Sequence, residues 1–358
     1  MSLRHLTGDQ RALLAEAAAL GRDVLAPLGA PGRVNRPLVK AMAEHGLLGR
    51  VLRPDASALE LCLLREGLAR TCTEAETALA VQGLGGFPLL ETEWLAPLAA
   101  GDAVAGFALS EPDAGTDVAA LSTRAEPDGD GWRLTGVKTW ISNAPDADVY
   151  TVFARAGDER GTRGISAFAL AGGAAGVSGE PLEMVAPHAI GRLELDGAQA
   201  ALVGEAGGGF RVAMRTLDRF RPSVGAAAVG MAQAALDLAV EHAARREAFG
   251  RPLKELQAVS HRLADTAVEV TAARLLVHQA AGAYDAGEPA TGLAAMAKLY
   301  ATETAQRAVD AAVQVHGARA LVAGHPLEHL YREVRAPRIY EGTSEIQREI
   351  IAREMFRT

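Results

Sequence analysis

In this chain of 358 residues, a segment with the pattern of strands lies between two segments with the pattern of helices. This order restricts the possible fold classes more than any other feature of the sequence. Over residues 6–98 the apolar residues recur at helical spacing. Helical periodicity returns after residue 209 and lasts to the end of the chain. Stretches that contain glycine and proline interrupt this second helical segment near 250–252, 287–289 and 317–326. The chain is therefore expected to be mainly α-helical, with a central β region.

The middle of the chain has the composition of strands. The sequence DGDG at Asp128–Gly131 predicts a hairpin turn, and residues 149–154, 164–170 and 192–195 read as strands. Strands do not alternate with helices, which disfavours a doubly wound parallel sheet. We predict three domains: an N-terminal helical domain over 1–100, a middle β domain over 101–205 and a C-terminal helical domain over 206–358.

Charge and cysteine content exclude several classes of function. The net charge of −8 and the isoelectric point of about 5.7 argue against a nucleic-acid binder, which needs a clustered basic face. Only four lysines stand beside 32 arginines. Cys62 and Cys72 form neither a disulfide framework nor a CxxC pair, which favours a reducing compartment. The N-terminus lacks the apolar core of a signal peptide, and the uncharged stretches are too short to span a bilayer. We expect a cytoplasmic protein that binds neither nucleic acid nor membrane.

Several short motifs fail on inspection. No lysine stands in a P-loop, and the glycines at Gly83–Phe87 lack the third glycine of a dinucleotide fingerprint and lie in a helical segment. The sequence HPLEH at His325–His329 matches the HxxEH zinc pattern. Gly324 and Pro326 indicate a helix N-terminus at which His325 is only the flanking residue. We therefore predict no metal site.

The C-terminal region contains one carboxylate in a suggestive place. Ser344 and Gln347 have capping-box spacing, which predicts a helix from Ser344 with Ile346, Ile350 and Ile351 on its buried side.

Glu341 then lies in the loop just before that helix, next to Gly342, which permits close approach to the backbone. No ion-pair partner is obvious in the local sequence. Such a carboxylate is a candidate base, although a surface or capping glutamate is the commoner outcome.

Six motifs, in order along nearly the whole chain, resemble the acyl-CoA dehydrogenase family. They are FALSEPDAGTDVAALSTRAE at 107–126, VKTWISNAPDADVYTVFAR at 137–155, GFRVAMRTLDRFRPSVGAAAVGMAQAALD at 209–237, REAFGRPLKELQAVSHRLAD at 246–265, QVHGA at 314–318 and RIYEGTSEIQREIIARE at 338–354. The resemblance implies an N-terminal helical domain, a β-barrel-like middle domain and a C-terminal four-helix bundle. It also implies FAD, held between these domains and across a subunit interface.

The resemblance implies a chemistry that makes physical sense of Glu341. Desaturation of an acyl thioester removes an α-proton and a β-hydride, so a base must face the flavin across the Cα–Cβ bond. Glu341 matches the family's base, and its backbone N–H, with a flavin ribityl hydroxyl, is implied as a donor to the thioester oxygen. Burial should raise the pKa of its carboxyl group toward the working pH. In relatives that carry the base on a helix instead, the corresponding position is Phe220 here.

The resemblance also implies contact residues for the cofactor. The residues implied to line or flank the flavin ring are Phe107, Leu109, Ser110, Trp140 and Ser142. Ser142 is implied to donate a hydrogen bond to N5 of the flavin. Other residues are implied to hold the pyrophosphate and adenine of FAD from a neighbouring subunit: Arg246, Phe249, Gln257, Gln314 and Gly317. Thr343 and Glu345 are implied on the adenine side. From the residues alone, Trp140 reads as a core aromatic of the β domain.

For the substrate, the resemblance implies Thr116, Asp218, Arg221 and Gly342 on the thioester or pantetheine side, and Thr116 is also counted among the cofactor contacts. Asp218 and Arg221 can equally form an ion pair one helical turn apart.

This chain departs from the family in two loops, because residues 49–64 lack the usual glycine-rich loop and residues 183–205 lack the usual GWR pattern. Such compact relatives occur in polyketide pathways, including methoxymalonyl extender-unit assembly, where an acyl carrier protein bears the thioester. The arginines Arg332, Arg335 and Arg338 can meet an acidic carrier protein, CoA phosphates, or Glu328 and Glu333 of the chain itself.

The function expected from the resemblance is an FAD-dependent acyl-thioester dehydrogenase, an oxidoreductase acting on CH–CH groups. Its substrate is a short acyl group on CoA or on an acyl carrier protein, its acceptor is an electron-transfer flavoprotein, and it forms a homodimer or homotetramer. The alternatives are a flavin-dependent oxidase or monooxygenase of the same fold, and a non-catalytic flavin-binding partner in a biosynthetic complex.

Overall fold

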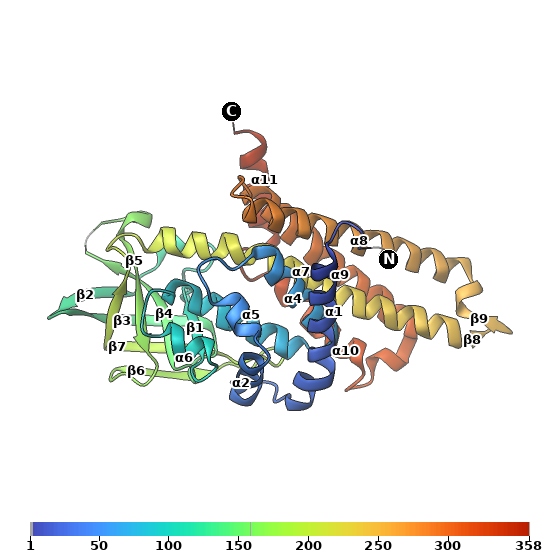
Figure 1. Ribbon diagram of the computed structural model, residues 1–358, viewed down its shortest axis with the longest axis horizontal. Helices are drawn as coiled ribbons and strands as arrows, with labels where there is room; N and C mark the ends of the chain where they lie inside the picture. The colour runs from blue at the N-terminus through green and yellow to red at the C-terminus, as the bar shows by residue number, and fades with distance from the viewer. Residues whose placement is uncertain (1–2, 158, 358) are drawn as a thin grey trace. The chain divides into compact units, whose positions relative to one another are not determined.

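The structure of the chain, a computed structural model, describes residues 3–157 and 159–357 (Figure 1). These residues pack as two compact units, each described by itself. Unit 1 comprises Met1–Pro27, Ser57–Glu76 and Asp218–Thr358, and unit 2 comprises Leu28–Ala56 and Thr77–Leu217. Helices α5 (Thr73–Gly86) and α7 (Gly209–Arg245) cross the boundary between the units.

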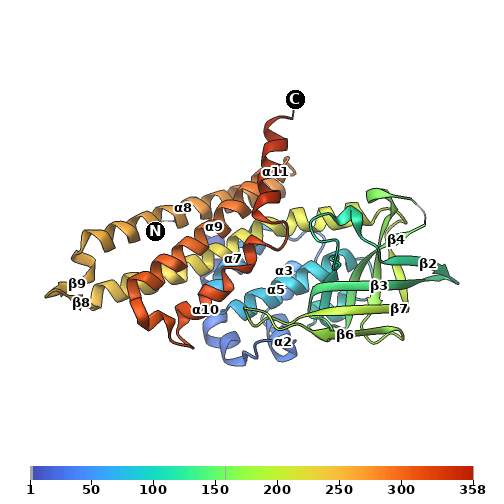
Figure 2. The same ribbon diagram turned by 180° about the vertical axis from the view of Figure 1, so that it is seen from behind.

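Unit 1 is built from helices, and α7, α8 and α9 run side by side in it, as both views show (Figures 1 and 2). Its α-helices besides α5 and α7 are α1 (Gly8–Leu20), α4 (Ala58–Thr71), α8 (Gln257–Asp285), α9 (Thr291–His316), α10 (Pro326–Glu333) and α11 (Ser344–Met355). Its shorter elements are a π-helix (Gly21–Leu25), the strands β8 (Glu247–Ala248) and β9 (Arg251–Pro252), and the 3₁₀ turns η6 (Leu253–Glu255), η7 (Gly317–Leu321) and η8 (Ala336–Arg338).

The helix ends in unit 1 follow local sequence signals. Thr7 and Gln10 form the predicted capping box at the start of α1. The breaks between α7, α8, α9 and α10 fall where glycine and proline predict them. Alanine dominates the buried core of these helices, and small side chains allow helices to approach closely. At Gly230 on α7, an added Cβ would collide with the backbone oxygen of Glu66 on α4, so only glycine fits there.

Two predictions at helix starts have different outcomes. His325 is the N-cap of α10, and its Nδ1 accepts from Leu327 N at 3.1 Å, as expected of a flanking residue. The N-cap of α11, however, is Thr343 rather than Ser344, since the Thr343 hydroxyl accepts from Ile346 N. Ser344 instead is buried and donates to Glu303 at 2.7 Å. The three isoleucines of α11 are half-buried rather than buried.

Unit 2 contains the β region and several short helical elements. The helices are α2 (Arg36–Glu44), α3 (Leu47–Val51) and α6 (Leu95–Ala99), and 3₁₀ turns lie at Phe87–Leu89, Val118–Ala120 and Gly161–Gly164. The strands are β1 (Ala105–Ala108), β2 (Arg124–Asp128), β3 (Gly131–Ser142), β4 (Val149–Ala156), β5 (Ile165–Ala171), β6 (Val177–Pro181) and β7 (Ile190–Val203).

The sheet of unit 2 closes on itself. The strand order is β1-β4-β2-β3-β7-β5, with β6 beside β7, and a further pairing of β4 with β5 completes a ring. The hairpin predicted at Asp128–Gly131 joins β2 to β3, and the three predicted strands correspond to β4, β5 and β7, although β5 begins one residue after the predicted start at 164. The mainly α fold with a barrel-like middle region, expected from the resemblance, is therefore confirmed.

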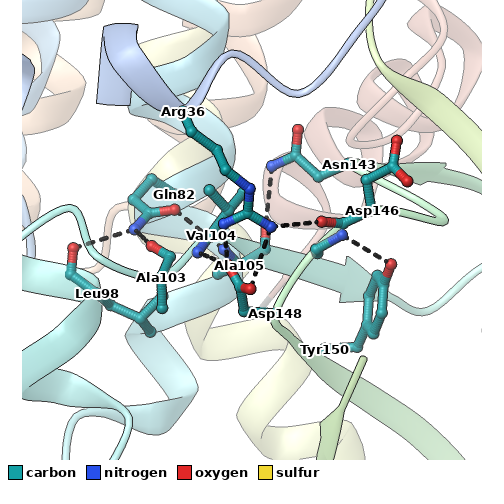
Figure 3. A network of polar contacts seen from close by, with 11 residues as sticks. Arg36, Gln82, Leu98, Ala103, Val104, Ala105, Asn143, Asp146, Asp148 and Tyr150 are labelled. Atoms are coloured by element: carbon teal, nitrogen blue, oxygen red, sulfur yellow. Dashed lines mark hydrogen bonds and ion pairs between the residues drawn. The ribbon is translucent and has the colours of Figure 1, made fainter. Parts of the chain in front are cut away.

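A buried glutamine links α5 to the segment that leads into β1 (Figure 3). Gln82 is 1% exposed, and its Nε2 donates to the carbonyl oxygens of Leu98 at 3.0 Å and Ala103 at 2.8 Å. Its Oε1 accepts from Ala105 N at 3.0 Å. Beside it, Asp148 accepts from Val104 N at 2.7 Å and pairs with Arg36 at 2.6 Å. One side chain thus satisfies three backbone groups where β1 begins.

Replacing Gln82 by leucine is expected to lower the free energy of unfolding by about 3 kcal/mol, because three backbone groups each lose a buried hydrogen bond. Urea unfolding followed by circular dichroism measures the change. The control is Gln199→Leu, which removes an exposed glutamine whose Nε2 donates to Asp128 at 2.9 Å. It should change the free energy by less than about 0.5 kcal/mol. A loss in Gln82→Leu as small as that of the control would contradict this account.

One described helix, α7, is long and apolar enough to cross a membrane by length and composition, and most of its apolar stretch is buried inside the protein. Within residues 3–157 and 159–357, no cluster of three or more His, Cys, Asp and Glu side chains is arranged to hold a metal ion.

Candidate active site

The loop between η8 and α11 holds Glu341 in an unusual backbone conformation. Glu341 has φ 52° and Gly342 has φ 93°, both in the left-handed region that disfavours side chains. Gln347 Nε2 donates to the carbonyl oxygens of Glu341 at 3.2 Å and Gly342 at 2.9 Å. Lys298 Nζ donates to the Gly342 carbonyl at 2.6 Å, and Arg221 Nε to the Glu341 carbonyl at 3.4 Å. Three side chains therefore fix two successive peptide groups.

The positive φ at position 342 favours glycine, which differs from the predicted reason. The amide of Gln347 lies beside it, and its Nε2 would be 2.5 Å from an added Cβ and would have to shift. The space beside Gly342 is thus filled by Gln347.

The Glu341 carboxyl group is buried and incompletely satisfied. Its Oε2 is buried and has no hydrogen-bond partner among the described residues. Its backbone N–H, likewise, donates to no backbone acceptor in the described ranges. Burial raises the pKa of the Glu341 carboxyl, Arg65, Arg221 and Lys298 oppose the rise, and Glu76 adds to it. A buried carboxylate with a raised pKa and a free oxygen is suited to accept a proton.

The two arginines near Glu341 are each paired with a carboxylate. Arg65 is 2% exposed, its Nε lies 2.5 Å from Glu76 Oε1, and its Nη1 donates to Ser223 Oγ at 2.7 Å. Arg221 Nη1 lies 2.8 Å from Asp218 Oδ1, the ion pair that the sequence left open. All of these residues and Glu341 belong to unit 1. The structure therefore brings three candidates, Asp218, Arg221 and Gly342, to Glu341.

Trp140 lies in a β-bulge of unit 2. The β3–β7 register shifts between Lys138 and Ile141, and Trp140 has φ 61° within the shift. Its side chain is 58% exposed, so the interpretation as a core aromatic is wrong. The bulge turns this residue out of the alternating pattern of β3.

A buried ion pair joins the two segments of unit 2 that carry the flavin candidates. Lys138 Nζ lies 2.8 Å from Glu111 Oε1 and donates to the Leu109 carbonyl at 3.1 Å. Thr139 N donates to the Ser110 carbonyl at 3.1 Å. Leu109 and Ser110 therefore lie beside the bulge that presents Trp140.

The remaining candidates in unit 2 are more dispersed. Phe107 is half-buried on β1, with its ring centroid 4.9 Å from that of Phe153. Ser142 pairs with Ile190 in the β3–β7 ladder. Thr116 lies in an exposed loop after β1.

Five further candidates gather at the other end of the helical unit. Stacked rings of His242 and His316, with centroids 4.1 Å apart, place the ends of α7 and α9 together. The five residues near these ends are Arg246 after α7, Phe249 between β8 and β9, Gln257 at the start of α8, Gln314 in the last turn of α9 and Gly317 after it. Phe249 is 93% exposed at φ 53°. Gln314 is 16 residues from Lys298 on α9, about 24 Å at the helical rise, so one chain does not bring this group to Glu341.

The last two candidates lie at the start of α11. Thr343 caps the helix, and Glu345 is exposed and 4.0 Å from Arg348.

Arg65, Lys298 and Gln347 were not predicted from the sequence as neighbours of Glu341, and no ion-pair partner of Glu341 was predicted. Arg65 and Lys298 are distant in sequence, so no local spacing relates them to the loop. A usable signal was the rarity of lysine: two of the four, Lys138 and Lys298, are fully buried. Gln347 was noted only as a capping residue.

Known proteins match most of this chain in sequence. Two family models match: "Acyl-CoA dehydrogenase, middle domain" over residues 106–198 and "Acyl-CoA dehydrogenase, C-terminal domain" over residues 207–356. The short-chain specific acyl-CoA dehydrogenase of Bos taurus is 38% identical over 89% of this chain and 82% of its own.

Solved structures agree over the full length. Butyryl-CoA dehydrogenase from Megasphaera elsdenii has a TM-score of 0.92 at 32% identity, and both chains are covered completely. A chain from a structure of the electron-transferring flavoprotein of Acidaminococcus fermentans has a TM-score of 0.94 at 33% identity, again with complete coverage of both. The FAD- and proline-bound protein PigA has a TM-score of 0.91 at 25% identity, with 99% of each chain covered.

Proposed function

Because this chain belongs to the acyl-CoA dehydrogenase family, we propose that it is a short-chain acyl-CoA dehydrogenase in which Glu341 removes the α-proton. It is an oxidoreductase, and FAD is its cofactor. The observation that carries the proposal is the buried Glu341 carboxyl group, whose Oε2 has no partner among the described residues and whose pKa is raised by burial.

The residues present fit FAD. Trp140 and Phe249 expose large aromatic surfaces at positive φ, and strained, exposed aromatics of this kind indicate ligand contact. Leu109, Ser110, Trp140 and Ser142 would hold the flavin ring, and Arg246 supplies a permanent positive charge for the pyrophosphate. When bound, FAD supplies the acceptor for the hydride that leaves Cβ.

Glu341 performs the proton step. Its carboxylate oxygen accepts the proton from Cα of the acyl thioester, and the electron pair of that C–H bond moves toward the carbonyl. The Glu341 N–H, free of any backbone acceptor in the described ranges, is proposed to donate to the thioester oxygen, where negative charge develops. The three side chains that donate to the loop carbonyls hold the Glu341 carboxylate and N–H in place. This lowers the entropy that must be lost to orient these groups during the reaction.

CoA is the carrier that we favour over an acyl carrier protein. The carrier-protein proposal, with its link to polyketide extender units, depends on Arg332, Arg335 and Arg338. Arg332 lies 2.8 Å from Glu328 and Arg338 lies 2.9 Å from Glu303, so two of the three charges are balanced within the chain. An acidic carrier protein would gain less binding energy from paired arginines than from unpaired ones.

We further propose an electron-transfer flavoprotein as the acceptor and a homo-oligomer as the assembly. The five candidates around Arg246 lie far from Glu341 along α9, which supports their use toward the FAD of a neighbouring subunit. The alternative of a non-catalytic flavin-binding partner does not account for an unsatisfied, buried carboxyl group, which costs stability.

The test is anaerobic bleaching of the bound flavin by butyryl groups offered as the CoA thioester and on an acyl carrier protein, with palmitoyl-CoA as a chain-length comparison. We expect rapid bleaching by butyryl-CoA and slower bleaching by the other two. Bleaching by the carrier-bound form alone would move the substrate to carrier-protein metabolism. No bleaching of a fully loaded flavin by any of them would overturn the proposal. Fast reoxidation by oxygen rather than by an electron-transfer flavoprotein would favour an oxidase.

A further inference from the structure

Lys298 is a buried cation that lies against the loop of Glu341. It lies on α9, is fully buried, and its Nζ donates to the Gly342 carbonyl at 2.6 Å. Burial lowers the pKa of Lys298 to about 8, and Glu341 opposes that change most strongly. At neutral pH the side chain is therefore mostly charged.

Lys298 differs from the two arginines near Glu341 in its partners. Arg65 is balanced by Glu76 and Arg221 by Asp218. Lys298 forms no ion pair with any carboxylate of the described residues, and its hydrogen bond goes to a neutral carbonyl. Once the two pairs cancel, one positive charge on Lys298 faces one negative charge on Glu341.

Other charged or titratable groups act on the same pair. They are Arg65 on α4, Glu76 on α5, Arg221 and Asp218 on α7, Glu303 on α9, Tyr340 in the loop and Glu345 on α11. Glu303 is occupied by Arg338 at 2.9 Å and Ser344 at 2.7 Å, and Glu345 is exposed. Neither therefore replaces Glu341 as the partner of Lys298.

We propose that Lys298 is a positioning residue for proton abstraction: its ammonium group clamps the Gly342 carbonyl, holding Glu341 in its left-handed conformation, and is the counter-charge of the Glu341 carboxylate. This inference rests on the proposed function of Glu341 as the base. A charge-assisted hydrogen bond is about twice as strong as a neutral one, which suits a loop held at two successive positive φ angles.

The two parts of this role can be separated by substitution. Lys298→Gln keeps a donor and removes the charge, Lys298→Met removes both, and Lys298→Arg keeps both. Removing a nearby positive charge raises the pKa of a carboxyl group, here that of Glu341, by about one pH unit. The acid limb of the pH profile for flavin bleaching should then move upward by about one unit in Lys298→Gln and Lys298→Met, and stay in Lys298→Arg.

Loss of the clamp should also slow the reaction. In Lys298→Met, kcat at the optimal pH is expected to fall roughly 10- to 100-fold, while KM changes little, because the base is displaced rather than the thioester site. Gln347→Leu, which removes a neutral donor to the same carbonyls, should slow the reaction without moving the acid limb. The charge-matched control is Lys254→Met, since Lys254 is exposed beside β9, at the end of unit 1 away from α11 (Figure 1).

A direct readout does not depend on turnover. The carboxyl infrared band that Glu341→Gln removes reports the titration of Glu341 in the FAD-loaded enzyme. A higher pKa of that band in Lys298→Gln than in wild type and Lys254→Met supports the inference, and equal pKa values overturn it. The infrared comparison can be made whether or not wild type oxidises butyryl-CoA. Failure of the proposed function is therefore distinguished from failure of this inference. If Lys298→Met does not fold, the comparison of Lys298→Gln with Lys298→Arg decides.

Discussion

Glu341→Gln is expected to slow the bleaching of bound FAD by butyryl-CoA roughly 10²- to 10⁴-fold, the usual contribution of a positioned general base. The amide has nearly the shape of the carboxyl group, but it cannot accept the α-proton. The backbone of residue 341 stays clamped by Gln347 and Arg221, so FAD content and thioester binding should change little.

Anaerobic stopped-flow measurements at saturating butyryl-CoA give this rate for wild type and variant. The matched control is Glu349→Gln, which changes an exposed glutamate on α11, and it should react at the wild-type rate. A Glu341→Gln enzyme that bleaches as fast as wild type would remove Glu341 from the role of base.

The pH dependence of the wild-type rate follows from the same carboxyl group. Only the ionised form accepts a proton, and burial raises the pKa of Glu341 above its usual value of 4.5. Activity should therefore fall, as the pH decreases, at a higher pH than the titration of an exposed glutamate would give. In Glu341→Gln the residual rate should lack this acid limb.

The second large effect concerns the buried ion pair of unit 2. Lys138→Met is expected to lower the free energy of unfolding by about 3–5 kcal/mol, the usual cost of leaving one buried charge without its partner. The charge left behind is Glu111, which is 4% exposed and accepts hydrogen bonds from Ser122 and Thr123. FAD content should fall as well, because Lys138 ties the Leu109 carbonyl to the bulge of Trp140.

Urea unfolding and the ratio of flavin to protein absorbance measure these two effects. Lys40→Met is the control, because Lys40 pairs with Asp102 at the surface and such pairs contribute little, about 0–1 kcal/mol. Adding Glu111→Gln to Lys138→Met should recover part of the loss, since it removes the unpaired charge. Equal stability of Lys138→Met and Lys40→Met would contradict a structural role for this pair.

The same pair predicts how acid destabilises unit 2. Despite the opposing effect of burial, Lys138 and the donors from Ser122 and Thr123 lower the pKa of Glu111 to about 2. Its stabilising contribution is complete above the ordinary value of 4.5 and is lost as the pH falls toward 2. At Lys138 burial outweighs the attraction of Glu111, and the pKa of Lys138 falls to about 8.

Local signals in the sequence predicted the elements well. The capping box of Thr7 and Gln10, the hairpin at Asp128–Gly131 and the helix breaks at glycine and proline each depend on a few neighbouring residues. The α11 cap was wrong by one residue because both Thr343 and Ser344 can cap, and Glu303, distant in sequence, engages Ser344.

The surroundings of Glu341 could not be predicted in the same way. The resemblance pointed to Glu341, but Arg65 and Lys298 reach it only through the packing of α4 and α9 in unit 1. The exposure of Trp140 depends on a register shift against β7, which alternation along β3 does not encode. Motifs therefore point to the proposed base, whereas tertiary packing determines which charges surround it.

The most direct test of the central claim is anaerobic flavin bleaching by butyryl-CoA deuterated at Cα. The account predicts that wild type bleaches more slowly with this substrate than with unlabelled butyryl-CoA, because Glu341 breaks the Cα–H bond as the flavin is reduced. In Glu341→Gln, exchange of the Cα hydrogens with solvent should also disappear. Bleaching of the wild-type flavin at the same rate with both substrates, together with exchange that persists in Glu341→Gln, would contradict the claim.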